Sequence, residues 1–556
     1  MARIPFDDIL NTNVVPSDAE CQRIHDLLAG PRKDLSDLMG EIARIQAELD
    51  QLTKKRVDLE DFIHAHEALL SPMRRLPDDT LRDLFLASLP CGRCATLSAV
   101  DPPLLLCHIC QRWRRLALST PGLWASLHIA LPPIDDSRTA QSPKLREIDD
   151  AVQAWLSRSG SLPISISFVV HGSGSGHYPI QQLLDVFTQH SRRWKSIRFD
   201  FPTHNLLAGF EALSPADVPL LRSAIISGFE STRLGGFSSK AEGRPYLSFL
   251  GAPTLDSLSI LHGNYDSLVV RWDALQHVSF QMIGLWADRA LELLRQCPAL
   301  ETCTLFIDTF PPRSDAVVSQ PCHLPHLKRL SVMDIGLMTE FFQYLVIPNL
   351  RCLEYTYWGR ATSPGLLPCF FILPSASCLE SLHLRVNTMT TDALAAGLRL
   401  VPTLRELRLS GEPPILNTGS KFPEYDPGLI PLLTPNSTTL EDAVLCPHLQ
   451  HITLLRFSAM TDAALLAFLL ARTDPSLPTG TRLTSARVHI SRPPDTDSNI
   501  TFTPTLQQRM ADGLQLSLEY RVSPREQLPR SSFPISRTSA NQDDSHDWDP
   551  VHTSWV

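Results

Sequence analysis

The feature that most constrains the fold is a short phrase that recurs along the second half of the chain. It reads Pro-x-Leu-x-x-Leu-x-Leu, or close to it, and its anchor leucines between Leu255 and Leu404 follow one another at intervals of 20 to 29 residues. The Leu-x-Leu ending has a period of two, which predicts a strand with one buried face. A single unit of this length cannot bury its own apolar face, so the repetition predicts a continuous stack of units. Clear copies begin at Pro253, Pro298, Pro325, Pro348, Leu379, Pro402 and Pro447.

Weaker copies extend the pattern to a predicted repeat region over residues 151–522, and stretches such as 392–398 and 462–470 have the composition of intervening helices. The unit length and the phrase resemble those of leucine-rich repeats, which implies an α/β solenoid with parallel strands. The alternative is an ordinary α/β domain. The weaker copies begin at Trp194, Leu221, Leu275 and Leu483.

A second pattern is a run of apolar residues at alternating spacings of three and four. It predicts a heptad α-helix over residues 34–70, with an a/d seam about four heptads long. Arg56 occupies an a position, where a polar residue fixes the register at some cost in stability. The seam favours either a homodimeric coiled coil through residues 35–63 or a helix that stays single or folds back on its own domain. The seam residues are Leu35, Leu38, Ile42, Ile45, Leu49, Leu52, Arg56, Leu59 and Ile63.

Three segments lie outside these patterns. Residues 1–33 form an N-terminal segment with a short helix over 17–29, which the Gly30-Pro31 pair is expected to end. Residues 129–150 are rich in proline and polar side chains and are predicted to be a linker. Residues 523–556 are rich in Ser, Pro, Asp and Gln, a composition typical of a disordered tail.

A third pattern lies between residues 72 and 128. It contains, in order, Leu-Pro, Leu-x-x-Leu-Phe, Cys-x-x-Trp-Arg-x-Leu-Ala and Pro-x-Leu-Trp. We expect one short helix after Leu76-Pro77 and a second that runs from Leu104 until Pro121 stops it. So small a unit is marginal on its own and carries more large apolar side chains than it can bury, so it needs a partner.

This order of residues resembles the F-box, of the type that is expanded in fungi and followed by a leucine-rich-repeat-like region. The insert at 90–103 separates the two halves more widely than in a compact F-box. Together with the two patterns above, the resemblance predicts a mixed fold: an N-terminal heptad helix, a small helical F-box and an α/β solenoid. It also implies that the module docks on the Skp adaptor of a cullin-RING ubiquitin ligase. The expected adaptor-binding face and its supporting core comprise Leu76, Pro77, Leu81, Leu84, Phe85, Leu104, Cys107 and Trp113.

The function that follows is that of a non-catalytic substrate receptor. The adaptor would bring the cullin and RING subunits, and the solenoid would hold a protein substrate whose identity the sequence does not reveal. The alternative is a coiled-coil and repeat scaffold that binds partners without ubiquitin transfer. No arrangement of Ser, His, Asp or Cys carries the local signature of a catalytic site, and no cofactor is expected.

Two Cys-x-x-Cys pairs have the outline of a zinc site: Cys91 with Cys94, and Cys107 with Cys110. The second pair lies in an apolar helical run where the F-box uses these positions for packing. Structural thiols are therefore the favoured interpretation, ahead of a zinc site that would suggest a nucleic-acid binder. The formal net charge of −9 also disfavours binding to a phosphate backbone.

The first ten residues contain Asp7 and Asp8 where a signal peptide would need cationic and apolar residues. No apolar stretch approaches the roughly 20 residues that span a bilayer. The expected location is therefore the cytoplasm, the nucleus or both.

Overall fold

The computed structural model divides the chain into two compact units, Met1–Leu84 and Phe85–Val556, and each is described by itself. The predicted tail at 523–556 and parts of several loops lie outside the described residues. The structure describes residues 6, 9–10, 12–131, 143–170, 180–202, 204–227, 246–261, 268–307, 320–336, 339–357, 367–375, 377–385, 390–411, 429–435, 445–457, 460–494 and 500–520.

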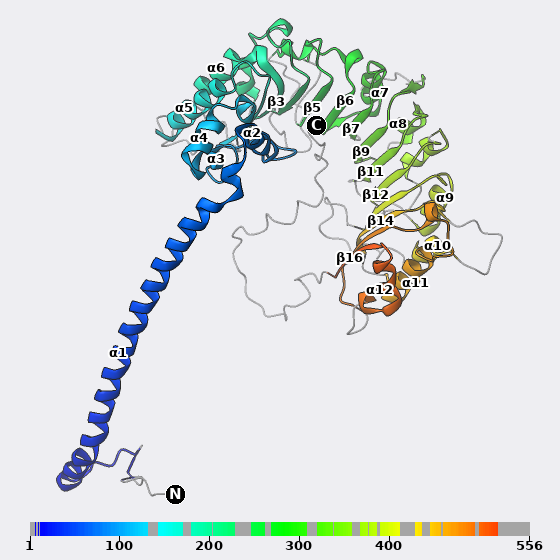
Figure 1. Cartoon of the computed structure of the whole chain (residues 1–556). Coiled ribbons are helices and arrows are strands. Elements are labelled where there is room, and N and C mark those ends of the chain that lie inside the picture. The colour runs from blue at the N-terminus through cyan, green and yellow to red at the C-terminus, as the bar shows by residue number, and fades with distance from the viewer. Residues whose placement is uncertain are drawn as a thin grey trace. The chain divides into compact units, whose positions relative to one another are not determined.

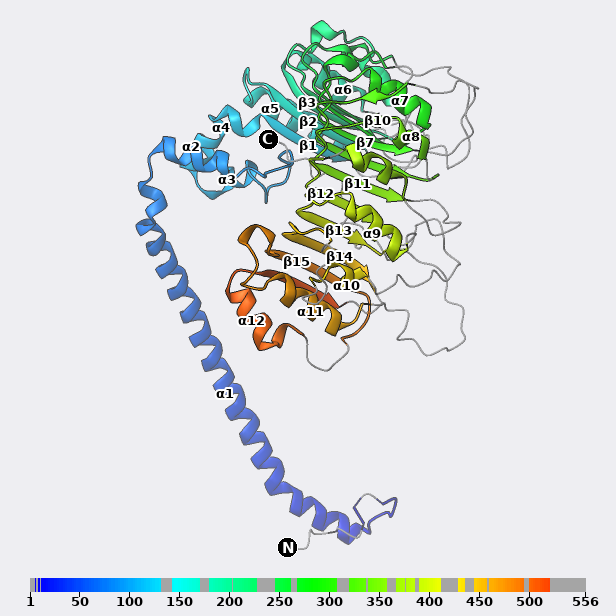
Figure 2. The same ribbon diagram turned by 90° about the vertical axis from the view of Figure 1, so that its right-hand side faces the viewer.

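The first unit is dominated by α1 (Asp18–Leu70), one helix of 53 residues. The carboxylate of Glu20 accepts hydrogen bonds from the backbone N–H and the hydroxyl of Ser17, at 2.8 and 2.7 Å, and so fixes the helix start. The expectation that Gly30-Pro31 ends a first helix is wrong, because Pro31 lies inside α1. A proline removes one backbone hydrogen bond and bends a helix without having to end it. The ribbon of α1 bends towards its N-terminal end (Figure 2).

A group of short helices follows α1: η1 (Pro72–Arg75), α2 (Asp78–Ala87), α3 (Leu104–Ile109), α4 (Gln111–Leu118) and η2 (Pro121–Trp124). The predicted single helix from Leu104 onwards is in fact two, because Cys110 adopts an extended conformation between them (φ −159°). The backbone N–H of Trp113 donates to the Sγ atom of Cys110 at 3.5 Å, so Cys110 caps the N-terminus of α4. Most residues between Leu104 and Leu118 favour a helix, so the sequence gives no sign of this break.

The second unit is built on a parallel sheet of 14 strands in which each strand pairs with its neighbours in chain order, apart from β8 and β10, which form a separate parallel pair. This is the topology that a stack of repeats predicts, and the prediction of a parallel-strand solenoid is confirmed at this level. The strands are β1 (Ser126–Leu131), β2 (Ile164–Val170), β3 (Trp194–Asp200), β4 (Ser223–Ser227), β5 (Ser257–Ile260), β6 (His277–Leu285), β7 (Thr302–Ile307), β8 (Cys322–His323), β9 (Arg329–Asp334), β10 (Leu345–Val346), β11 (Cys352–Tyr357), β12 (Ser381–Arg385), β13 (Glu406–Ser410), β14 (His451–Phe457), β15 (Ser485–Ile490) and β16 (Gln515–Tyr520).

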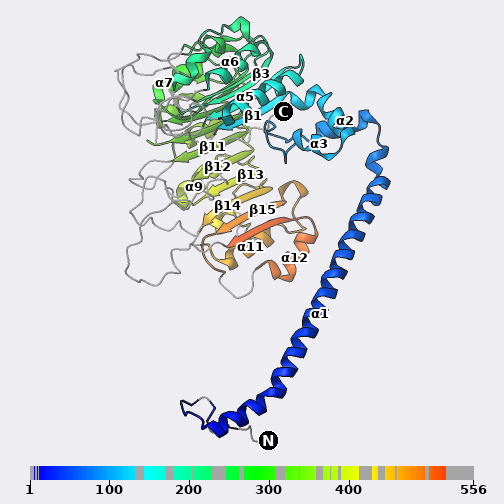
Figure 3. The ribbon, with the colours of Figure 1, turned by 90° about the vertical axis from the view of Figure 1, so that its left-hand side faces the viewer.

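The helices that follow β1 lie along one face of the sheet, and no described helix covers the other face (Figures 1 and 3). The core lies between the two layers, and side chains such as Ile197, Phe199, Leu382 and Leu384 alternate into it along their strands. The α-helices are α5 (Pro143–Arg158), α6 (Gln181–Gln189), α7 (Ala287–Arg295), α8 (Thr339–Gln343), α9 (Thr391–Arg399), α10 (Leu429–Leu433), α11 (Asp462–Arg472) and α12 (Pro504–Ala511). The 3₁₀ helices are η3 (Ser191–Arg193), η4 (His204–Phe210), η5 (Pro215–Asp217), η6 (Ser248–Gly251), η7 (Trp272–Ala274), η8 (Pro368–Ser375), η9 (Thr479–Thr481) and η10 (Ile500–Phe502).

The sheet begins earlier than the repeat phrase suggests. The second half of β1 and the first half of α5 fall in the predicted linker at 129–150, of which residues 132–142 lie outside the described residues. The segment between α2 and α3 joins this end of the sheet directly: the N–H of His128 donates to the carbonyl of Ala95 at 2.6 Å. The indole of Trp124 packs edge-on against Trp155 of α5, with ring centroids 4.8 Å apart. Strand β1 lacks the Leu-x-x-Leu phrase, so the repeat pattern could not find it.

Within the part of the chain that the structure describes, no helix is both long enough and apolar enough to cross a membrane.

Candidate interaction surfaces

The residues predicted to bind an adaptor fall into three groups by exposure. Leu81, Phe85 and Cys107 are buried. Leu76, Leu104 and Trp113 are half-buried, whereas Pro77 and Leu84 are exposed. The predicted set therefore contains both buried and exposed side chains.

The supporting core of the short helices is aromatic and hydrogen-bonded. The ring of Phe85 lies 4.9 Å from the ring of Trp113, centroid to centroid. The Nε atom of Arg114 donates to the carbonyl of Cys107 at 2.7 Å, and so ties α4 to α3. The Nε1 atom of Trp124 donates to the carbonyl of Ala117 at 2.9 Å, which satisfies a buried indole.

An apolar face that the sequence analysis missed lies on α3. Leu105 and Ile109 are four residues apart, so they share one side of this helix, and both are exposed. Leu106 and Cys107 turn inward instead. The four-residue spacing of Leu105 and Ile109 places them on one face of a helix. However, almost all six residues of α3 are apolar, so the sequence does not reveal which face is buried.

The four cysteines of the candidate zinc site have different environments. Cys91 and Cys110 are exposed, and the Sγ atom of Cys110 serves as the cap of α4. Burial raises the pKa of Cys94 to about 11, and burial also raises the pKa of Cys107, so both thiols stay protonated at neutral pH. Among the described residues, which include these four, no three His, Cys, Asp or Glu side chains gather in a way that could hold a metal ion.

A second candidate surface is the face of the 14-stranded sheet opposite the helices, here called the uncovered face. Every second side chain of each strand points to it, and the parallel register aligns these side chains in rows across the sheet. The first row runs through Ser126, Ser165, Ser196, Ser223, Ser257, His277, Thr302, Arg329, Cys352, Ser381, Glu406, His451, Ser485 and Gln515. The second row runs through His128, Ser167, Arg198, Ile225, Ser259, Ser279, Thr304, Ser331, Glu354, His383, Arg408, Thr453, Arg487 and Ser517.

Glu406 is the centre of a polar network on the C-terminal half of this face. Its carboxylate accepts a hydrogen bond from the Ser381 hydroxyl at 2.9 Å and lies 3.4 Å from the Nε2 atom of His383. The hydrogen bond with His383, together with that from Ser381, lowers the pKa of Glu406 to about 2, against the effect of burial. A second His–Glu contact, between His489 and Glu519, also has a separation of 3.4 Å. This half of the face therefore presents ionic groups that neighbouring strands hold in place.

Buried charges anchor the last repeats. The guanidinium of Arg472 is almost fully buried and donates to three carbonyls, those of Leu433 at 2.8 Å, Cys446 at 3.0 Å and Leu445 at 2.6 Å. Burial lowers the pKa of this group. Because all three acceptors belong to the chain segments before α11, Arg472 joins those segments to the end of that helix.

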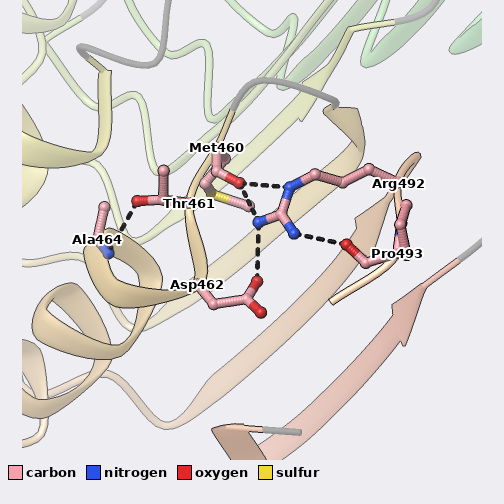
Figure 4. Close-up of polar contacts among 6 residues, drawn as sticks. All are labelled: Met460, Thr461, Asp462, Ala464, Arg492 and Pro493. Carbon is pink, nitrogen blue, oxygen red and sulfur yellow. Dashed lines mark hydrogen bonds and ion pairs between the residues drawn. The ribbon is translucent and has the colours of Figure 1, made fainter. Parts of the chain in front are cut away.

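A second anchor lies at the other end of α11 (Figure 4). The NH2 atom of Arg492 lies 2.8 Å from Oδ1 of the buried Asp462, and Nε of Arg492 donates to the carbonyl of Met460 at 3.1 Å. The hydroxyl of Thr461 accepts the N–H of Ala464 at 3.2 Å and caps the helix. Arg492 follows β15, so this contact fixes the helix start to the end of the next strand.

Comparison with known proteins does not assign the chain to a family. No family model matches the chain, and no curated protein matches it. Among solved structures 36 chains match, one of which is described as the crystal structure of the TLR13-ssRNA13 complex. That structure is 12% identical in sequence, with a TM-score of 0.23, and the match covers 68% of this chain and 53% of the other. The chain thus spans about half the length of that structure.

Proposed function

We propose that the protein is the substrate receptor of a Skp-cullin-F-box ubiquitin ligase. The observation that carries the proposal is the F-box-like order of residues between 72 and 128, combined with how its apolar side chains are divided. Phe85 and Trp113 make a compact core, whereas Leu84, Leu105 and Ile109 remain exposed. Exposed apolar groups on a small helical module are what docking on an adaptor needs.

In this proposal the chain carries out no chemistry itself. The adaptor brings the cullin scaffold and the RING subunit, which recruits the ubiquitin-charged enzyme. The solenoid holds a protein substrate on its uncovered face, because a stack of repeats offers an extended binding surface. Holding a substrate lysine near the charged thioester raises its effective concentration, and this proximity is the source of the rate enhancement.

The test is direct binding of the purified full chain to purified Skp adaptor by calorimetry. Changing Leu105→Glu and Ile109→Glu together places two charges on the exposed face of α3 and should weaken binding at least tenfold. The matched control is Leu220→Glu, an equally exposed leucine outside the short helices, which should bind like the parent. A folded parent chain that does not bind the adaptor would overturn the proposal.

The second candidate is a coiled-coil and repeat scaffold, which the exposed apolar seam of α1 favours. A scaffold of this kind should purify with its partners but without the adaptor, so the same binding experiment separates the two functions. Metal analysis of the purified chain addresses the third candidate, a zinc-dependent nucleic-acid binder, which requires bound zinc.

A further inference from the structure

The apolar seam of α1 is exposed along its whole length. The eight leucine and isoleucine side chains at its a and d positions are each between 50% and 61% exposed. From the first to the last they span about 42 Å at 1.5 Å per residue. Contiguous apolar patches of this extent are rare on monomers and mark interaction sites. The eight residues are Leu35, Leu38, Ile42, Ile45, Leu49, Leu52, Leu59 and Ile63.

The partner of such a seam must be a helix of similar length with a matching heptad pattern. Among the described helices the next longest, α5, has 16 residues and packs through Trp155 against Trp124 of η2. It is too short to cover the seam in one piece. A second copy of α1 has both the length and the pattern, which makes the chain itself the partner that fits best.

The charges flanking the seam decide the orientation of two such helices. Lys54, Lys55 and Arg56 form a cationic run in the middle of the helix. In a parallel pair in register, the two runs would lie side by side, with the Arg56 guanidiniums facing each other across the seam. In an antiparallel pair whose two-fold axis lies between Leu49 and Leu52, each run lies opposite residues 45–47 of the other helix, next to Glu48. Lys55 meets a glutamate of the other helix in either orientation, Glu60 in a parallel pair and Glu48 in an antiparallel pair. Only the parallel pair brings the two Arg56 charges together on the seam, which is unfavourable, so the antiparallel pair is preferred.

We propose that α1 forms an antiparallel homodimer whose two-fold axis lies between Leu49 and Leu52. In this register Leu49 packs against Leu52 of the partner subunit, and Ile42 packs against Leu59 of the partner subunit. Arg56 lies opposite Ile45 of the partner subunit, where its aliphatic stem can follow the apolar seam and leave the charge at the edge. The heptad positions also place Glu48 beside Lys55 of the partner subunit, twice by symmetry.

This arrangement does not depend on ubiquitin transfer. The chain segments that follow Leu70 leave the rod at opposite ends, so a dimer carries two copies of every binding surface. Two surfaces on one particle raise the avidity for any target that offers two sites. The dimer can therefore form whether or not the chain binds the adaptor, and the two are tested separately.

The first test is the mass of the full chain by sedimentation equilibrium at micromolar concentration. We expect a reversible dimer with twice the 61.9 kDa of one chain. Changing Ile45→Asp and Leu49→Asp together should give a monomer with an unchanged repeat region. A parent chain that remains monomeric up to about 50 µM, a concentration at which coiled coils of this length associate, would overturn the proposal.

Charge exchange tests the orientation. Lys55→Glu should weaken the dimer roughly threefold to tenfold, because two attractive contacts become repulsive. Adding Glu48→Lys should restore it if the pair is antiparallel. Adding Glu60→Lys instead should restore it only if the pair is parallel, since Lys55 would then face Glu60 of the partner subunit. The control is Lys54→Glu, which makes the same charge change on the outer side of the helix and should leave the dissociation constant unchanged.

The outcomes of this exchange are distinct. Recovery by Glu48→Lys alone supports the antiparallel dimer. Recovery by Glu60→Lys, or a dissociation constant that Lys55→Glu leaves unchanged, overturns the orientation and the register.

Discussion

The two halves of the repeat sheet are built differently, both inside and on the uncovered face. On β1 to β7 the two rows of the uncovered face are mostly Ser and Thr, and Arg198 is their one permanently charged member. On β9 to β16 the same rows hold five permanently charged side chains: Arg329, Glu354, Glu406, Arg408 and Arg487. Because charged groups provide specificity in recognition, a partner that is selected by its charge should bind the C-terminal half.

The interior shows the same contrast. Under β2 to β5 the core is a cluster of aromatic rings, in which Phe199 stacks on Phe210 with centroids 4.5 Å apart and meets Trp194 at 5.7 Å. Under β14 and β15 the layers are joined by the buried guanidinium of Arg472 and by the pair of Arg492 and Asp462. The core under β2 to β5 therefore rests mainly on non-directional apolar packing, whereas the core under β14 and β15 also contains hydrogen bonds from buried charged groups. In a solenoid each repeat contacts only its neighbours, so removing a contact in one half should destabilise that half alone.

The largest effect is expected in the aromatic half. Phe199→Ala removes a fully buried ring that contacts several others, and should lower the free energy of unfolding by about 3–5 kcal/mol. Urea denaturation measures the loss, and amide hydrogen exchange should locate it in β2 to β5. If protection fell equally in β14 to β16, the two halves would not be separate in their stability.

A slightly smaller effect is expected from Arg472→Leu. The change keeps an apolar side chain in place but leaves the carbonyls of Leu433, Leu445 and Cys446 without their donor, which should cost about 2–4 kcal/mol. Hydrogen exchange should rise in β14 to β16 and remain unchanged in β2 to β5. The control is Arg399→Leu, the same substitution at an exposed site on α9, which should be nearly neutral.

A pH-dependent effect is expected at Glu406. Its pKa is about 2 in the folded chain against a usual 4.5, so the folded state binds the proton more weakly than the unfolded state. The stabilisation is therefore complete above about pH 5 and is lost as the pH falls towards 2. Because the carboxylate is 44% exposed, solvent screening limits its size to about 1 kcal/mol. Parent and Glu406→Gln should differ in free energy of unfolding at pH 6 and converge near pH 2; a constant difference would contradict this.

The sequence predicted the parallel-strand stack because the repeat phrase places a leucine at each buried position of most strands. It missed β1, whose Ser-Leu-His-Ile-Ala-Leu segment alternates correctly but follows no anchor leucine. It could not predict the charged network either, because Glu406 is distant in the chain from Ser381 and His383 and meets them only through the register of β12 and β13. The break at Cys110 depends on a sulfur acting as a helix cap, a role that Ser, Thr, Asp or Asn usually fill.

The smallest effect is expected in the serine part of the first row, and it sharpens the contrast with Glu406. Ser223 and Ser257 lie directly opposite each other on β4 and β5, in the same row as Glu406. Changing both to Ala keeps the strands and the core intact, so the free energy of unfolding should change by less than about 0.5 kcal/mol at any pH between 3 and 7. Thermal and urea denaturation of the double variant measure this. A loss above about 1 kcal/mol would mean that these two hydroxyls hold β4 and β5 together, as the contact of Ser381 with Glu406 holds β12 and β13, and would remove this contrast between the two parts of the uncovered face.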